Sequence, residues 1–170
     1  MLSPPTFGNI IHKKRDGKSL TREEIDFVIN SFTHNKIPDY QMSSLLMAIY
    51  TRGMSVKETA HLTEAMLYSG EVLNHPYQNI VDKHSTGGIG DKTSFIIAPI
   101  AAAAGVYVPM IAGRGLAYTG GTIDKLESIP NFQTHMNFKE FHSQIDKIGC
   151  GIISQSSEIC PADKKLYSIR

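Results

Sequence analysis

Two glycine-rich segments set the strongest limit on how this chain can fold. The first is Lys83–Ser94 and the second is Gly113–Glu127, and both combine glycines with hydroxyl and basic side chains. Glycine lets backbone N–H groups approach an anion closely, and Ser and Thr add hydroxyl donors. A helix that starts just after such a loop adds the positive end of its dipole. Two such loops that converge would hold a dianion such as phosphate from two sides.

The sequence before these loops is predicted to be helical over residues 1–70. Thr21 and Ser55 each stand three residues before a Glu, which is the capping-box pattern that begins a helix. Another helix is expected to start near Pro38, and Gly53 suits its C-terminal end. Apolar residues recur at helical spacing after each start. The pattern therefore predicts three successive helices, whose apolar stripes form a core or, in part, a dimer face.

Beyond residue 76 the pattern changes to alternating strands and helices. Strands are predicted at residues 80–82, 106–111 and 151–154, and helices at 94–104, 123–128, 138–148 and from 161. Such alternation is typical of a mainly parallel α/β sheet. We therefore predict an α/β fold class. A small all-helical lobe at 1–70 is followed by the start of a mainly parallel α/β lobe at 71–160, incomplete, with glycine-rich phosphate-binding loops.

Composition excludes several classes of protein. The chain has 170 residues and a net charge of +1, which gives no electrostatic case for a nucleic-acid or membrane partner. The two cysteines, Cys150 and Cys160, favour a reducing compartment over a disulfide scaffold. The longest apolar run, residues 96–108, is interrupted by Pro99 and Gly105 and is too short to span a bilayer. We expect a cytoplasmic protein.

The two loops resemble those of the thymidine and pyrimidine-nucleoside phosphorylase family. The resemblance runs from Asp82 to Glu127 and resumes over Pro161–Arg170, and the N-terminal helical region also fits. Members of that family run to well over twice this length. The resemblance implies a helical lobe and an α/β lobe across a cleft, with phosphate on the α/β side. It also implies that residues 161–170 return towards the helical lobe, through which we expect a homodimer to form.

The resemblance assigns roles to six residues. Four of them match phosphate ligands: Lys83, Ser85, Ser94 and Thr122. An ammonium group and three hydroxyls suit a tetrahedral dianion, although any one of these residues alone would more often be a solvated lysine or a loop-capping hydroxyl. His84 and Arg170 match base-binding positions and are the predicted catalytic residues. Their side chains would hydrogen-bond the departing pyrimidine and stabilise its negative charge.

Other positions in the two loops have a structural interpretation or depart from the family pattern. Arg114, Asp124 and Glu127 are expected to pair with one another or to cap a helix, which is a scaffold role. Ala112 stands where the family usually has a phosphate-binding Ser, and Lys92 stands where some members place a cation-binding Thr. The resemblance implies no organic cofactor, and we predict no metal ligands.

The activity that the resemblance implies for the full-length parent is phosphorolysis of thymidine to thymine and 2-deoxy-α-D-ribose 1-phosphate. This is a pentosyltransferase reaction of nucleotide salvage, with phosphate and a pyrimidine nucleoside as substrates. At position 110 the chain carries Met and so resembles thymidine phosphorylases, since the broader pyrimidine-nucleoside type tends to carry Lys at this position. The alternatives are a broader pyrimidine-nucleoside or AMP phosphorylase, or a non-catalytic truncated fragment that acts only as a dimerising and phosphate-binding module. A relative more distant by fold is the anthranilate phosphoribosyltransferase type, against which the Arg170 motif argues.

Overall fold

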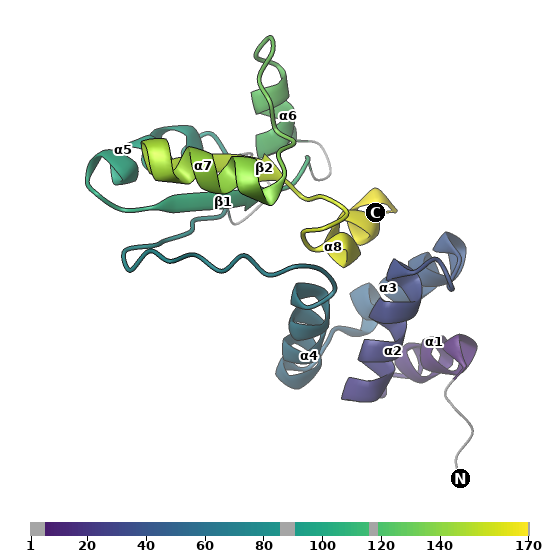
Figure 1. Cartoon of the computed structure of the whole chain (residues 1–170). Helices are drawn as coiled ribbons and strands as arrows, with labels where there is room; N and C mark the ends of the chain where they lie inside the picture. The colour runs from purple at the N-terminus through teal and green to yellow at the C-terminus, as the bar shows by residue number, and fades with distance from the viewer. Residues whose placement is uncertain (1–5, 86–90, 116–118, 170) are drawn as a thin grey trace. The chain divides into compact units, whose positions relative to one another are not determined.

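A computed structural model describes residues 6–85, 91–115 and 119–169. The chain divides into two compact units, whose helices and strands are labelled in Figure 1. One unit combines the described residues of Met1–Val72 and Ser156–Arg170, and the other comprises those of Leu73–Gln155. The first is helical and the second is α/β with a parallel sheet, so the predicted fold class is confirmed.

Five helices form the described part of the helical unit. They are α1 (Phe7–Arg15), α2 (Arg22–Thr33), α3 (Asp39–Arg52), α4 (Val56–Leu67) and α8 (Pro161–Ser168). The capping boxes predicted at Thr21 and Ser55 are both present, each closed by a Glu at the third helical position. Helix α1 adds to the three helices predicted before residue 70. Its N-cap is Thr6, whose hydroxyl accepts from the Asn9 N–H, and because Asn9 is not a Glu the capping-box signal is absent.

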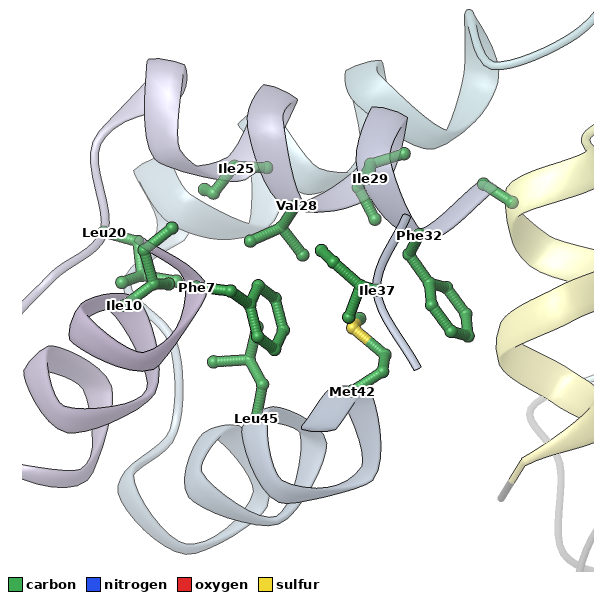
Figure 2. Packing of buried hydrophobic residues seen from close by; sticks show 11 residues of the cluster. Phe7, Ile10, Leu20, Ile25, Val28, Ile29, Phe32, Ile37, Met42 and Leu45 are labelled. Atoms are coloured by element: carbon green, nitrogen blue, oxygen red, sulfur yellow. The ribbon is translucent and has the colours of Figure 1, made fainter. Parts of the chain in front are cut away.

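Buried apolar side chains from α1, α2, α3 and their connections point into one shared core (Figure 2). Phe32 and Ile10 are completely buried within it. Helix α8 joins this core through Ala162, although it lies far along the sequence. The Lys165 ammonium lies 4.1 Å from the centre of the Phe32 ring and donates to Asn35 Oδ1 at 2.7 Å. A cation held over an aromatic face therefore helps to fasten α8 to α2.

The α/β unit contains two paired strands and three helices among its described residues. They are α5 (Ser94–Ala103), β1 (Val108–Ala112), α6 (Thr122–Glu127), α7 (Phe138–Ile148) and β2 (Cys150–Ser154). The strands are parallel, with Val108 opposite Cys150 and Ala112 opposite Ser154. Helix α7 is capped by Asn137 and ends at Gly149 in the left-handed conformation, and its bounds match the helix predicted at residues 138–148.

The predicted strand at residues 80–82 is wrong in extent. Among the described residues, an isolated parallel bridge joins Ile80 to Tyr107, and Val81 N donates to Tyr107 O at 3.0 Å. Pairing stops there. The Asp82 carboxylate accepts from the Lys83 N–H at 2.7 Å, and such a local side-chain bond competes with the hydrogen bonds of a strand ladder. Strand pairing therefore ends before the first glycine-rich segment begins at Lys83.

None of the helices that the described residues form is long and apolar enough to cross a membrane.

The two cysteines have the properties of unreactive thiols. Cys150 and Cys160 are both free, and burial raises the pKa of each thiol. Because the thiolate is the reactive form of cysteine, neither residue has the character of an activated nucleophile.

Candidate functional site

The side chain of Lys83 lies at the N-terminal end of α5, where it meets three oxygen atoms. Its ammonium nitrogen is 2.7 Å from Asp91 Oδ1, 3.0 Å from Thr93 Oγ1 and 3.0 Å from Ser94 Oγ. Ser94, the first residue of α5, is completely buried. The structure therefore brings together Lys83 and Ser94, two of the four predicted phosphate ligands, beside the positive end of a helix dipole.

Asp91 organises this cluster, and its role was not predicted from the sequence. Its carboxylate accepts from the Lys83 ammonium, the Thr93 hydroxyl, the Ser94 hydroxyl and the Ser94 N–H. Burial alone would raise the pKa of Asp91, but the hydrogen bonds from Lys83, Ser94 and Thr93 outweigh it and hold the pKa well below its ordinary value. The local sign of this role is an Asp shortly before a predicted helix, because Asp91 accepts from the N–H of Ser94, the first residue of α5, at 3.3 Å.

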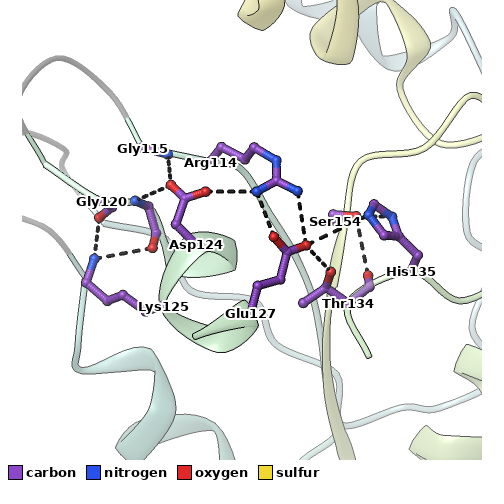
Figure 3. A network of polar contacts seen from close by, with 10 residues as sticks. Arg114, Gly115, Gly120, Asp124, Lys125, Glu127, Thr134, His135 and Ser154 are labelled. Carbon is purple, nitrogen blue, oxygen red and sulfur yellow. Dashed lines mark hydrogen bonds and ion pairs between the residues drawn. The ribbon is translucent and has the colours of Figure 1, made fainter. Parts of the chain in front are cut away.

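The second glycine-rich segment is held by a carboxylate network (Figure 3). Asp124 Oδ2 accepts from the N–H groups of Gly115 at 2.6 Å and Gly121 at 2.8 Å, and Asp124 Oδ1 accepts from Arg114 at 2.9 Å. Burial alone would raise the pKa of Asp124, but the hydrogen bonds from Gly121, Gly115 and Arg114 lower it. Glu127 accepts two hydrogen bonds from the same guanidinium group, at 2.7 and 3.0 Å. The predicted pairing of these charged residues is confirmed.

The same network continues to the end of strand β2. Thr134 Oγ1 donates to Glu127 Oε1 at 2.7 Å, and the Ser154 N–H donates to the Thr134 carbonyl at 2.9 Å. Ser154 Oγ lies 2.8 Å from His135 Nδ1. Because Ser154 is the last residue of β2, these contacts tie α6 to the carboxyl end of the sheet. That edge is where parallel α/β sheets commonly bind ligands.

The other predicted site residues have different positions. Thr122 is the first residue of α6, in the second loop, and Ala112 ends β1 just before that loop. His84 is exposed, and its Nδ1 lies 2.8 Å from the Ser85 carbonyl oxygen. Arg170 lies outside the described residues. The assignment of these residues to phosphate and base stays a prediction.

Comparison with known proteins places this geometry in a family. A glycosyl transferase helical bundle domain matches residues 8–70, and a glycosyl transferase a/b domain matches residues 77–170. A pyrimidine-nucleoside phosphorylase from Geobacillus stearothermophilus is 51% identical over 164 residues, which is 95% of this chain and 38% of that protein. A thymidine phosphorylase from Colwellia psychrerythraea is 50% identical over 163 residues, covering 95% of this chain and 37% of that protein.

A solved structure shares the fold at lower identity. Anthranilate phosphoribosyltransferase from Thermus thermophilus superposes with a TM-score of 0.72 at 22% identity, covering 95% of this chain and 49% of that one. The likeness concerns the fold alone. This chain thus spans less than half the length of each of these three proteins. With both domain models matched in order, the chain belongs to the glycosyl transferase family that includes the thymidine and pyrimidine-nucleoside phosphorylases.

Proposed function

We propose that the protein with this chain is a pentosyltransferase that cleaves thymidine with phosphate. The products are thymine and 2-deoxy-α-D-ribose 1-phosphate. One observation carries the proposal: within a chain of this family, the Lys83 ammonium and the Ser94 hydroxyl meet at the N-terminal end of α5. A lysine point charge, a hydroxyl group and a helix N-terminus together favour a phosphate anion.

The reaction that we propose is a single displacement at the anomeric carbon of the sugar. Phosphate, held by Lys83, Ser85, Ser94 and Thr122, forms the new C–O bond on the face opposite the base. The bond between the anomeric carbon and the pyrimidine nitrogen breaks, and its electron pair leaves with the base. Arg170 and His84 would stabilise the negative charge on that base by donating hydrogen bonds. Positioning and electrostatics would supply most of the acceleration.

The choice of thymidine over a broader nucleoside range rests on one position. The two relatives named above differ by one percentage point in identity, so identity alone does not separate the activities. Met110 is buried in the sheet, where it packs in a cluster with Ala98 and Val108. An uncharged side chain at this position resembles the thymidine-specific pattern. A broader pyrimidine-nucleoside phosphorylase is therefore the second candidate.

The test is a substrate comparison with the purified protein. Thymidine, uridine and AMP are each incubated with and without inorganic phosphate, and the free base and the sugar phosphate are quantified. We expect thymine to form only when phosphate is present, and faster than uracil forms from uridine. Similar rates for both nucleosides would support the broader activity. Phosphate binding without turnover of any substrate would support a binding module instead.

We also infer that two copies pair through the helical unit of this proposed cytoplasmic enzyme. Tyr40, Met47 and Tyr50 are exposed by 71%, 60% and 85%, and all three belong to α3. Their spacing of seven and three residues puts them on one side of that helix. Large apolar side chains left in water on one helix face favour association. Light scattering after size exclusion should give the mass of a dimer for the wild type and of a monomer for Tyr50→Lys.

A further inference from the structure

The donor protons of the Lys83 cluster are already in use. The ammonium group has three protons, and its contacts with Asp91, Thr93 and Ser94 provide three acceptors. Each hydroxyl group has one proton. The Thr93 hydroxyl donates to Asp91 Oδ1 at 3.0 Å, and the Ser94 hydroxyl donates to Asp91 Oδ2. The described contacts therefore account for every side-chain proton that these three residues could offer to an anion.

The cluster is also electrically balanced. Lys83 contributes one positive charge and Asp91 one negative charge, and Asp91 is only 8% exposed. A buried charge is screened much less by salt than an exposed one. An incoming phosphate anion would therefore meet the negative charge of Asp91 next to the side-chain donors of Lys83 and Ser94. Binding through these side chains requires at least one donor to leave its present acceptor, and that acceptor is Asp91 for both hydroxyl protons and for one of the three ammonium protons.

From this geometry we propose that Asp91 is a resident counter-anion of the phosphate site. Its carboxylate holds the donors of Lys83, Thr93 and Ser94 in place while the site is empty of substrate and yields them to phosphate on binding. Asp91 thereby lowers the affinity for phosphate and sets the concentration range in which the site fills. The inference rests on the proposed function, because it takes phosphate as the anion.

Asp91→Asn tests the charge while nearly preserving the shape. The amide oxygen still accepts from Lys83 and Thr93, so both side chains keep a partner. The amide NH₂ group replaces the oxygen beside Ser94, which then accepts a hydrogen bond and frees its own proton for the ligand. Asp146→Asn is the matched control, because it removes one carboxylate charge from the same unit at an exposed position on α7.

The measurement is calorimetric titration of inorganic phosphate into the wild-type protein and both variants, after thermal unfolding has shown that each is folded. We expect Asp91→Asn to bind phosphate about 10-fold more tightly, as removal of an adjacent like charge predicts. Asp146→Asn should bind like the wild type. Equal or weaker binding by folded Asp91→Asn overturns the inference but leaves the proposed function intact. A wild-type protein that binds no phosphate overturns both.

A second measurement needs no variant and covers the case in which Asp91→Asn does not fold. The carboxyl carbon of Asp91 is followed by NMR during a phosphate titration of the ¹³C-labelled wild-type protein. Loss of hydrogen-bond donors should shift this resonance, with the same midpoint as the calorimetric titration. A resonance that stays fixed while phosphate saturates the site would show that Asp91 keeps its donors, and the inference would be wrong.

Discussion

The Lys14 ammonium and the Glu58 carboxylate lie 2.6 Å apart, with both side chains buried. Glu58 Oε1 also accepts from the Leu20 N–H at 2.9 Å, and Oε2 accepts from the N–H and hydroxyl of Ser55 at 2.8 and 2.9 Å. One carboxylate therefore closes the capping box of α4 and holds the end of α1. A buried carboxylate that is satisfied in this way joins local and long-range structure in one group.

Removing this carboxylate should destabilise the chain strongly. Glu58→Gln leaves the Lys14 ammonium buried without a counterion, which typically costs about 3–5 kcal/mol. The matched control is Glu24→Gln, because Glu24 occupies the same capping-box position in α2 and pairs with Lys13 at 2.7 Å, but is partly exposed. The control should cost about 1 kcal/mol or less. Denaturant unfolding of both variants measures the difference. Equal losses of unfolding free energy would contradict the prediction that the buried carboxylate contributes more than the partly exposed one.

The same pair predicts how stability depends on pH. Burial alone would raise the pKa of Glu58, but the hydrogen bonds from Lys14, Leu20 and Ser55 lower it from 4.5 to about 2. A carboxylate with a lowered pKa stabilises the folded state above its unfolded pKa and loses that contribution as pH falls. The free energy of unfolding of the wild type should therefore decrease between about pH 5 and pH 2. In Glu58→Gln this decrease should be smaller. An identical pH profile in the variant and the wild type would show that protonation of Glu58 does not cause the decrease.

Local signals explain what the sequence predicted correctly. The predicted capping boxes of α2 and α4 each lie within four consecutive residues, so the pattern contains both partners. Asp124 and Glu127 lie three residues apart on α6, which makes their common contact with Arg114 foreseeable. Helix α1 lacks the local signal because Asn9 takes the place of the capping Glu.

The features that the sequence did not predict depend on contacts between segments that are distant along the chain. Ser55 and Glu58 reveal a capping box, but nothing nearby shows that Glu58 pairs with Lys14, which precedes it by 44 residues. No local pattern assigns Asp91 its role, because the ammonium that it binds belongs to Lys83, outside the turn of helix that Asp91 caps. In both cases one carboxylate binds a backbone N–H at the start of a nearby helix and also a lysine ammonium from another part of the chain. The sequence pattern predicts the contact with the helix, and only the fold shows the contact with the lysine.

Lys83→Ala should weaken phosphate binding by about 10- to 100-fold, because a hydrogen bond to a charged group contributes roughly 1.5–3 kcal/mol. The loss also leaves the Asp91 carboxylate without its cation next to the anion, which acts in the same direction. Lys92→Ala is the control, since Lys92 is an exposed lysine in the same segment. Calorimetric titration with phosphate should show a near-normal affinity for the control. If the two substitutions weaken phosphate binding equally, Lys83 is not a phosphate ligand.

Gly121→Ala should disrupt the second loop, whereas Gly120→Ala should not. A Cβ atom at Gly121 would lie 2.2 Å from the backbone carbon of Arg114 and 2.3 Å from the Gly115 nitrogen, so the backbone itself would have to move. At Gly120 the nearest atom to a Cβ is the flexible Lys125 Nζ, at 4.0 Å.

Overpacking of this kind costs about 1–3 kcal/mol or more, while a substitution into open space usually changes stability by less than about 0.5 kcal/mol. Denaturant unfolding measures the cost. Amide NMR spectra locate it, since movement of the loop should shift the Gly115 N–H, which donates to Asp124. An unchanged Gly115 resonance in Gly121→Ala, together with wild-type stability, would mean that the backbone at Gly121 does not approach Arg114 and Gly115 this closely.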